Sequence, residues 1–170
     1  MSELFILPEP RPGGTDRPAW RAWTAHGESV AGTLVELAAW RDRHAPESAI
    51  TLLLPAEWLL LTEVTLPTRQ AGKRAQALPF ALEEHLLQDP ARLHCVAGAP
   101  DGDGRSAAAA VDRERLQGVL DALGGANLLP SRALPDALCL PLETGRLTAL
   151  DADGRCLLRW GAAHGTAVPS

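Results

Sequence analysis

Short apolar runs, each closed by proline, glycine or an Asp-Gly turn, alternate along this chain with amphipathic helical segments. Because strands and helices have different hydrophobic periods, this alternation is typical of a mixed α/β fold with several antiparallel neighbours. We expect strands at 4–7, 50–54, 58–66 and 127–133, a helical turn at 135–140, and hairpins that pair 19–25 with 28–31, 93–97 with 105–111, and 147–150 with 156–160. Pro8 is expected to stop the first strand.

Three helical segments complete this pattern. The first opens with a capping box, Thr33-Leu34-Val35-Glu36, in which the threonine hydroxyl and the glutamate each accept from a backbone N–H. Asp112 provides a similar side-chain cap for the third. We expect the helices to run from Thr33 to Pro46, from 68 to 87 with an interruption at Pro79, and from Asp112 to Gly124-Gly125.

Composition limits both the class of protein and its partners. With 170 residues, of which 46% are hydrophobic, the chain can bury a core without disulfides or metals. A formal net charge of −5 argues against a general nucleic-acid binder, which normally carries a basic face. The clearest break lies near Asp89-Pro90, so we predict a first subdomain at 1–89 and a second portion, with hairpins and one long helix, at 90–170.

The longest apolar stretch, residues 50–61, is broken by Pro55 and Glu57 and is far shorter than the roughly 20 residues that a membrane helix needs. The N-terminus lacks the basic start and apolar core of a signal peptide. We therefore expect this chain itself to be soluble and without a membrane segment. Cys95, Cys139 and Cys156 are odd in number and widely spaced, which favours buried, inert thiols in a reducing compartment.

Two acidic loops, 101–105 and 151–155, invite a calcium hypothesis, but each places arginine at the fifth position, where a calcium loop needs an oxygen ligand. Asp-Gly hairpin turns explain both loops better. The chain contains no Walker loop, G-x-S-x-G elbow or H-E-x-x-H pattern. Glu83-Glu84-His85 diverge around a helix and do not converge on one point. We accordingly predict no catalytic, cofactor-binding or metal-binding residues.

The segment 68–89 carries the strongest signal for function. Its cations precede its anions, an order that opposes the helix dipole, so local helix stability does not explain it. Leu78, Leu82 and Leu86 form one apolar stripe, while Phe80 and Leu87 fall on nearly the opposite side. A helix that is apolar on two faces is either a two-sided core helix or one that offers a face to a partner. Under the second alternative the contact residues are Phe80, Glu83, Glu84 and Leu87.

Several segments, in order along the chain, resemble the cytoplasmic domain of the type II secretion system protein L family. These segments are Leu53-Leu54-Pro55-Ala56-Glu57, Leu66-Pro67-Thr68-Arg69-Gln70, Ala77-Leu78-Pro79-Phe80-Ala81-Leu82-Glu83-Glu84-His85-Leu86, Asp89, Leu93-His94, Leu134-Pro135-Asp136-Ala137-Leu138-Cys139-Leu140-Pro141 and Leu157-Leu158-Arg159-Trp160-Gly161. The resemblance implies an actin-like fold, related to ribonuclease H, with a mixed sheet and flanking helices in two subdomains. Family members run beyond the equivalent of Ser170, so the last subdomain is expected to be incomplete in this chain.

The resemblance also implies a function and partners. It predicts a non-enzymatic adaptor on the cytoplasmic side of the bacterial inner membrane, in a full-length protein that crosses the membrane once. The expected partners are the N-terminal domain of the secretion ATPase (protein E), then protein M and protein F of the membrane platform; a homodimer is also compatible with the family. No cofactor and no nucleic acid are expected.

Two alternatives remain open. An actin-like fold raises the hypothesis of a nucleotide-binding phosphotransferase fragment. Active members carry an Asp-x-Gly phosphate turn after the first strand, but this chain has Pro8-Glu9-Pro10 there, and proline supplies no N–H to a phosphate. We therefore predict no nucleotide hydrolysis. The second alternative is a pilus-assembly adaptor of the same superfamily.

Overall fold

The computed structural model describes residues 3–9, 19–68, 70–86, 89–152 and 154–170. The chain folds as two units: Met1–Pro55 with Gln117–Asp136, and Ala56–Leu116 with Ala137–Ser170. Residues on both sides of the predicted boundary at residue 89 belong to the second unit. A subdomain boundary at that position remains a prediction from the sequence.

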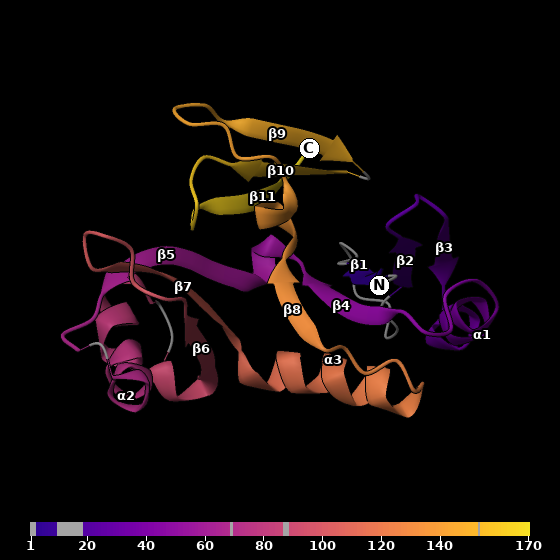
Figure 1. Cartoon of the computed structure of the whole chain (residues 1–170), viewed down its shortest axis with the longest axis horizontal. Coiled ribbons are helices and arrows are strands. Elements are labelled where there is room, and N and C mark those ends of the chain that lie inside the picture. Colours follow the sequence, from indigo (N-terminus) through magenta and orange to yellow (C-terminus); the bar gives the residue numbers. More distant parts are fainter. Residues whose placement is uncertain (1–2, 10–18, 69, 87–88, 153) are drawn as a thin grey trace. The chain divides into compact units, whose positions relative to one another are not determined.

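The first unit contains a five-stranded mixed sheet in the order β3-β2-β1-β4-β8 (Figure 1). Its strands are β1 (Glu3–Glu9), β2 (Ala19–Thr24), β3 (Ser29–Gly32), β4 (Ala49–Leu54) and β8 (Arg132–Pro135). The first three form an antiparallel meander, and β4 and β8 add parallel strands at the free edge of β1. The helix α1 (Leu34–His44) connects β3 to β4, and α3 (Arg113–Gly125) precedes β8. The mixed sheet and its helical connections confirm the expected α/β fold class with flanking helices.

Pro8 does not stop β1, and that expectation was wrong. The strand continues to Glu9, and Pro8 pairs with Trp20 of β2. On its other side β1 pairs with β4 only from Glu3 to Ile6. Pro8 thus lies where β1 has one neighbouring strand, a position that tolerates a residue without an N–H donor.

The capping box of α1 is confirmed. The Glu36 backbone N–H donates to Thr33 Oγ1 at 3.4 Å, and Glu36 Oε2 accepts from the Thr33 backbone N–H at 2.7 Å. The bond from the Thr33 backbone N–H, followed by one from the Thr33 hydroxyl to Glu36 Oε2 at 2.9 Å, lowers the pKa of Glu36 below its usual value. The backbone N–H groups of Thr33 and Glu36 would otherwise be unpaired at the helix N-terminus.

Replacing Thr33 with alanine is expected to destabilise the first unit by about 1 kcal/mol, because one N-terminal N–H loses its acceptor and the reciprocal bond loosens. Urea unfolding followed by circular dichroism measures this loss. Val35→Ala is the control, because Val35 is 77% exposed on the same helix. Equal midpoints for Thr33→Ala and the native chain would contradict the capping role.

A polar cluster joins three strands of this sheet. The buried Thr51 hydroxyl donates to Glu3 Oε1 at 2.6 Å, Arg132 Nε donates to Thr51 Oγ1 at 2.8 Å, and Arg132 also pairs with Glu3. The hydrogen bond from Thr51, followed by that from Arg132, lowers the pKa of Glu3 below its ordinary value of 4.5.

A carboxyl group whose pKa is lowered on folding stabilises the native state above its unfolded-state pKa, and that contribution disappears as the pH falls through the folded-state pKa. The native chain is therefore expected to lose more stability than Glu3→Gln when the pH falls from neutrality to below about 4. Urea midpoints for both proteins across this pH range test the expectation. Parallel curves would show that Glu3 contributes no pH-dependent stability.

The second unit contains two three-stranded sheets. One has the order β5-β7-β6, with β5 (Leu59–Thr65), β6 (Leu93–Ala97) and β7 (Arg105–Asp112), all antiparallel. The other has the order β11-β10-β9, with β9 (Thr148–Ala152), β10 (Arg155–Arg159) and β11 (Gly165–Pro169). The short helical turns η1 (Ala56–Trp58), η2 (Glu83–His85), η3 (Pro90–Arg92) and η4 (Asp136–Cys139) connect these elements. The predicted hairpins are confirmed, whereas β11 was not anticipated.

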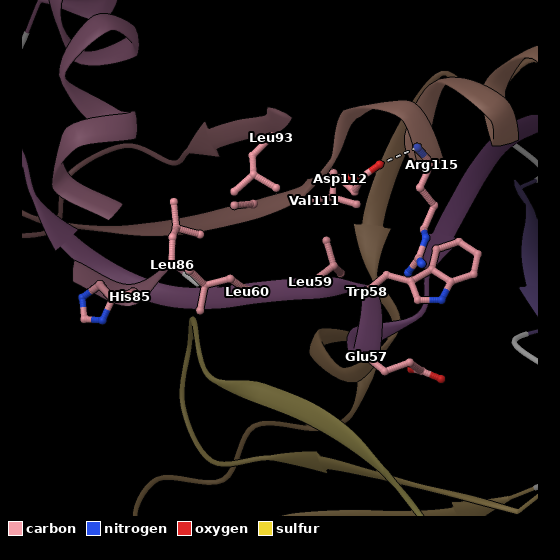
Figure 2. A pocket seen from close by; sticks show the side chains of 11 residues that line it. Glu57, Trp58, Leu59, Leu60, His85, Leu86, Leu93, Val111, Asp112 and Arg115 are labelled. Atoms are coloured by element: carbon pink, nitrogen blue, oxygen red, sulfur yellow. Dashed lines mark hydrogen bonds between the residues drawn. The ribbon is translucent and has the colours of Figure 1, made fainter. Parts of the chain in front are cut away.

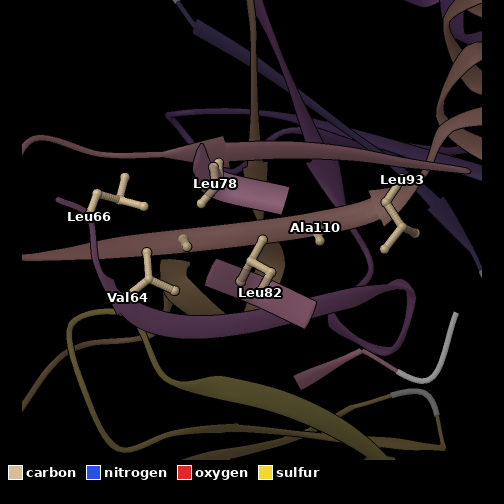
Figure 3. Packing of buried hydrophobic residues seen from close by; sticks show 7 residues of the cluster. Val64, Leu66, Leu78, Leu82, Leu93 and Ala110 are labelled. Carbon is tan, nitrogen blue, oxygen red and sulfur yellow. The ribbon is translucent and has the colours of Figure 1, made fainter. Parts of the chain in front are cut away.

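The helix α2 (Ala71–Leu82) packs on the β5-β7-β6 sheet. Leu78 and Leu82 are almost fully buried there, in a cluster with Val64, Leu66, Leu93, Ala108 and Ala110 (Figure 3). The predicted interruption at Pro79 is wrong, since the helix continues to Leu82. Pro79 lacks only the N–H that would bond the Ala75 carbonyl, and the buried leucines on both sides of it hold the last turn in place.

The end of α3 also differs from expectation. Gly124 and Gly125 belong to the helix, and Asn127 reverses the chain with φ 57°. The Leu128 N–H donates to the Leu123 carbonyl at 2.8 Å and the Asn127 N–H to the Gly124 carbonyl at 3.0 Å, which is a Schellman motif with asparagine in the left-handed position. At the other end, Asp112 Oδ1 accepts from the Arg115 N–H at 2.8 Å, as predicted.

The loop at 101–105 is the expected hairpin turn. Asp101 Oδ1 accepts from the backbone N–H groups of Asp103 and Arg105, at 2.9 and 2.8 Å. The second acidic loop includes Asp153, which lies outside the described residues. Within the described ranges, no group of three or more histidine, cysteine or acidic residues is arranged to hold a metal ion.

None of the three cysteines is fully buried, which corrects the expectation. Cys139 is exposed, and Cys95 and Cys156 are half-buried. No helix in the described part of the chain has the length and apolar character needed to span a membrane.

Candidate functional site

The helix α2 has two different faces. Leu78 and Leu82 are 2% and 0% exposed, but Phe80 is 75% exposed. A helix with a buried core on both sides would hide this aromatic ring. The structure therefore places Phe80 on a solvent-facing surface, and large exposed apolar side chains of this kind often mark interaction sites.

Phe80 lies on the rim of a groove of about 550 Å³ between α2 and β6, here called the α2–β6 groove. The groove is lined by Ala75, Pro79, Phe80, Glu83, Asp89, Pro90, Ala91, Leu93, His94, Cys95 and Arg113. It brings together two of the predicted contact residues, Phe80 and Glu83. Glu84 is exposed on η2 but does not line the groove, and Leu87 lies outside the described residues.

Charge in the groove comes from two carboxylates and one guanidinium. Glu83 and Asp89 are exposed, and Asp89 Oδ1 accepts from the Ala91 N–H at 2.9 Å. Arg113 Nη2 donates to the Leu93 carbonyl at 2.8 Å, so part of its hydrogen-bonding capacity is used within the fold. The groove thus combines an exposed aromatic ring with acidic walls.

The Cys95 thiol also lines this groove. Burial raises the pKa of the Cys95 thiol, and the nearby Arg113 charge opposes this only in part. A raised pKa keeps the thiol protonated near neutral pH, and the protonated thiol is a poor nucleophile. The arrangement is therefore better suited to binding than to covalent chemistry.

Arg74 anchors the exposed helix beside the sheet. Its Nη2 donates to the Gly98 carbonyl at 2.5 Å and to Ser106 Oγ at 2.8 Å, and Ser106 is buried. These contacts reach from α2 to the end of β6 and to β7. The helix face that carries Phe80 is consequently held in a defined position on the sheet.

A second pocket, of about 320 Å³, opens beside Trp58 (Figure 2). The Arg115 guanidinium lies 5.1 Å from the centre of the Trp58 ring, a cation–π contact, and Asp112 and His85 also line the pocket. Glu57 at its edge is paired with Arg155 at 2.5 Å. Sequence reasoning missed this pocket, because Trp58 and Arg115 lie far apart in the chain and no local pattern connects them.

The strand order of the first sheet, with its helical connections, defines a mixed α/β protein. The model of the family "Type II secretion system (T2SS), protein L" matches residues 12–170. The chain belongs to this family.

Individual relatives agree. Type II secretion system protein L of Vibrio cholerae is 32% identical over 157 residues, which cover 88% of this chain and 37% of the relative. The protein of the same name from Pseudomonas aeruginosa is 36% identical over 149 residues, which cover 84% of this chain and 36% of the relative. The chain thus spans little more than a third of the length of these relatives.

A solved structure also matches. The cytoplasmic domain of EpsL, an inner-membrane component of the type II secretion system of Vibrio cholerae, aligns with a TM-score of 0.76 and 26% identity. The alignment covers 98% of this chain and 71% of that one. The likeness therefore extends over both units of the chain.

Proposed function

We propose that this chain is a non-enzymatic adaptor of the type II secretion system, which links the cytoplasmic secretion ATPase to the inner-membrane platform. The observation that carries the proposal is the exposed Phe80 in the acidic α2–β6 groove of a protein L family member. Aromatic residues are among the side chains that contribute most to binding energy at protein interfaces. The groove is the docking site for the ATPase N-terminal domain. Phe80 and Glu83, which line it, are contacts, and so is the exposed Glu84 of η2, which does not.

The remaining partners follow from the family. In the full-length protein, protein M and protein F of the inner-membrane platform are the further partners, and pairing of two copies is a further contact. The Vibrio cholerae relative is named an inner-membrane component with a cytoplasmic domain, which supports a place for this chain on the cytoplasmic side of that membrane. The family match favours this role over that of a pilus-assembly adaptor.

The competing function is nucleotide chemistry, which the actin-like fold raises. Two observations at the end of β1 argue against it. Pro10, the residue that follows β1 in the sequence, has no N–H to offer to a phosphate. The Glu9 carboxylate, on the last residue of β1, pairs with Arg21 at 2.8 Å, so this carboxylate is already engaged within the sheet.

A pull-down tests the proposal. The immobilised chain is expected to retain a secretion ATPase of protein E type when candidate purified ATPases are offered one at a time, and to release no phosphate from ATP with magnesium on its own. Retention of no such ATPase would reject the adaptor role. Saturable nucleotide turnover by the purified chain would favour the competing function.

Reversal of charge tests the acidic wall. Glu83→Lys with Glu84→Lys is expected to weaken ATPase-domain binding at least about tenfold. If the partner surface is basic, the charge reversal turns its electrostatic attraction to the two glutamates into repulsion, both during the approach and in the complex. Both side chains are exposed, so the thermal unfolding temperature should stay the same. The control is Glu28→Lys with Glu47→Lys, which makes the same change in net charge at exposed positions of the first unit. Equal affinities for the two double variants would show that the effect is one of net charge alone.

A further inference from the structure

The strand β6 has a free edge. In its sheet the order is β5-β7-β6, so the described strands pair with β6 only on the β7 side. Edge strands usually carry lysine, proline or a bulge that prevents pairing with another chain. Leu93–Ala97 contains no lysine, arginine or proline, and its register with β7 is regular. The outward N–H and C=O groups of this edge are therefore available for pairing with another strand.

The register shows which backbone groups point outward. Beyond the end of β6, the Gly98 N–H donates to the Ala107 carbonyl at 2.8 Å, which continues the pairing of Ala97 with Ala108. In an antiparallel pair, residues alternate between those that bond to the neighbour and those that point away. Val96 and His94 therefore bond toward β7, and the N–H and C=O groups of Cys95 and Ala97 face the free edge.

The α2–β6 groove gives an incoming strand room beside β6. Ala75 and Pro79 of α2, which have short side chains, line this groove together with Cys95 of β6. Pro79 also has no N–H to give to the Ala75 carbonyl, so this acceptor on the groove wall is not used in the helical ladder. At the start of β6, Arg113 already occupies the Leu93 carbonyl, which limits the open part of the edge to Cys95 and Ala97.

Charge indicates what kind of segment fits. Within the described residues, neither Glu83 nor Asp89 forms an ion pair with a basic side chain, although both are exposed on the groove. Phe80 adds an apolar surface at the rim. Because side chains of an extended segment alternate between two directions, one such segment can place an apolar residue on Phe80 and a basic residue near the two carboxylates.

We infer that the partner binds this groove by adding an extended segment, with basic and apolar side chains, as a fourth strand beside β6. The inference rests on the proposed function, in which this partner is the N-terminal domain of the secretion ATPase. Main-chain hydrogen bonds to Cys95 and Ala97 supply binding that depends little on sequence, and Phe80 with the two carboxylates supplies the selectivity.

Amide hydrogen exchange of the full chain, with and without a saturating ATPase N-terminal domain, tests this inference. The Cys95 and Ala97 amides are expected to exchange at least about tenfold more slowly in the complex. Ala97→Pro removes one outward N–H that the fold does not use, so it should weaken binding about tenfold with an unchanged unfolding temperature. Val96→Ala is the matched control, because Val96 is 50% exposed and its backbone bonds toward β7.

The possible outcomes distinguish failure of strand addition at β6 from failure of the proposed function. A complex that depends on Phe80, but leaves the Cys95 and Ala97 amides unprotected, would overturn strand addition and leave docking intact. Absence of any complex would overturn the proposed function. Protection of the same amides in the chain alone, with a concentration-dependent dimer in sedimentation, would assign the edge to a second copy and so overturn the inferred occupant. If Ala97→Pro fails to fold, amide exchange of the native chain still decides.

Discussion

Phe80→Ala is expected to weaken binding of the secretion ATPase N-terminal domain by roughly 30-fold, about 2 kcal/mol, the size typical of a central aromatic contact. The reason is geometric. Phe80 is 75% exposed in the free chain and lies on the rim of an acidic groove, so the ring is available to a partner without any rearrangement of the core. Titration calorimetry with the purified domain measures the change.

The control for this variant is Val35→Ala. Val35 is 77% exposed but lies on α1 in the first unit, whereas the groove residues belong to the second unit. It should bind like the native chain. If both variants bind equally well, Phe80 is not a contact, and the groove loses its principal support as the docking site.

Leu82→Ala is expected to have the largest effect on stability. Leu82 is 0% exposed within the cluster that joins α2 to its sheet, and loss of such a side chain costs about 2 to 5 kcal/mol. Because the chain has two units, one overall unfolding curve need not be two-state. Amide exchange of Ala108 and Ala110 in the central strand β7 reports this unit directly, and it should accelerate at least about 30-fold.

Phe80→Ala is the matched control for Leu82→Ala, since the two residues are two positions apart on one helix. It should leave the Ala108 and Ala110 amides unchanged while it weakens binding. Equal exchange in Leu82→Ala and the native chain would contradict the packing of α2. A loss of both stability and binding in Phe80→Ala would mean that its ring supports the fold.

Local patterns predicted much of this fold. The α1 capping box, the Asp112 cap and the hairpins were all anticipated, since each depends on residues a few positions apart. Proline was misjudged twice for the same reason. Pro8 and Pro79 each remove one N–H, but whether a strand or helix ends there depends on neighbouring strands and buried side chains far away in sequence.

The site was only partly predictable. Periodicity placed Phe80 opposite Leu78 and Leu82, and the structure shows that this side is exposed. The groove itself also needs Cys95 from β6 and Arg113 from α3, which the antiparallel register of β6 and β7 brings beside α2. Helical spacing carries no information about such contacts, so neither residue was a candidate.

The proposed adaptor binds a protein partner and performs no nucleotide chemistry. One pair of calorimetric titrations into the native chain tests it most directly, first with the N-terminal domain of the secretion ATPase and then with ATP and magnesium. We expect a saturable heat of binding for the domain and none for the nucleotide. The opposite pattern, saturable nucleotide binding with no response to the domain, would contradict it.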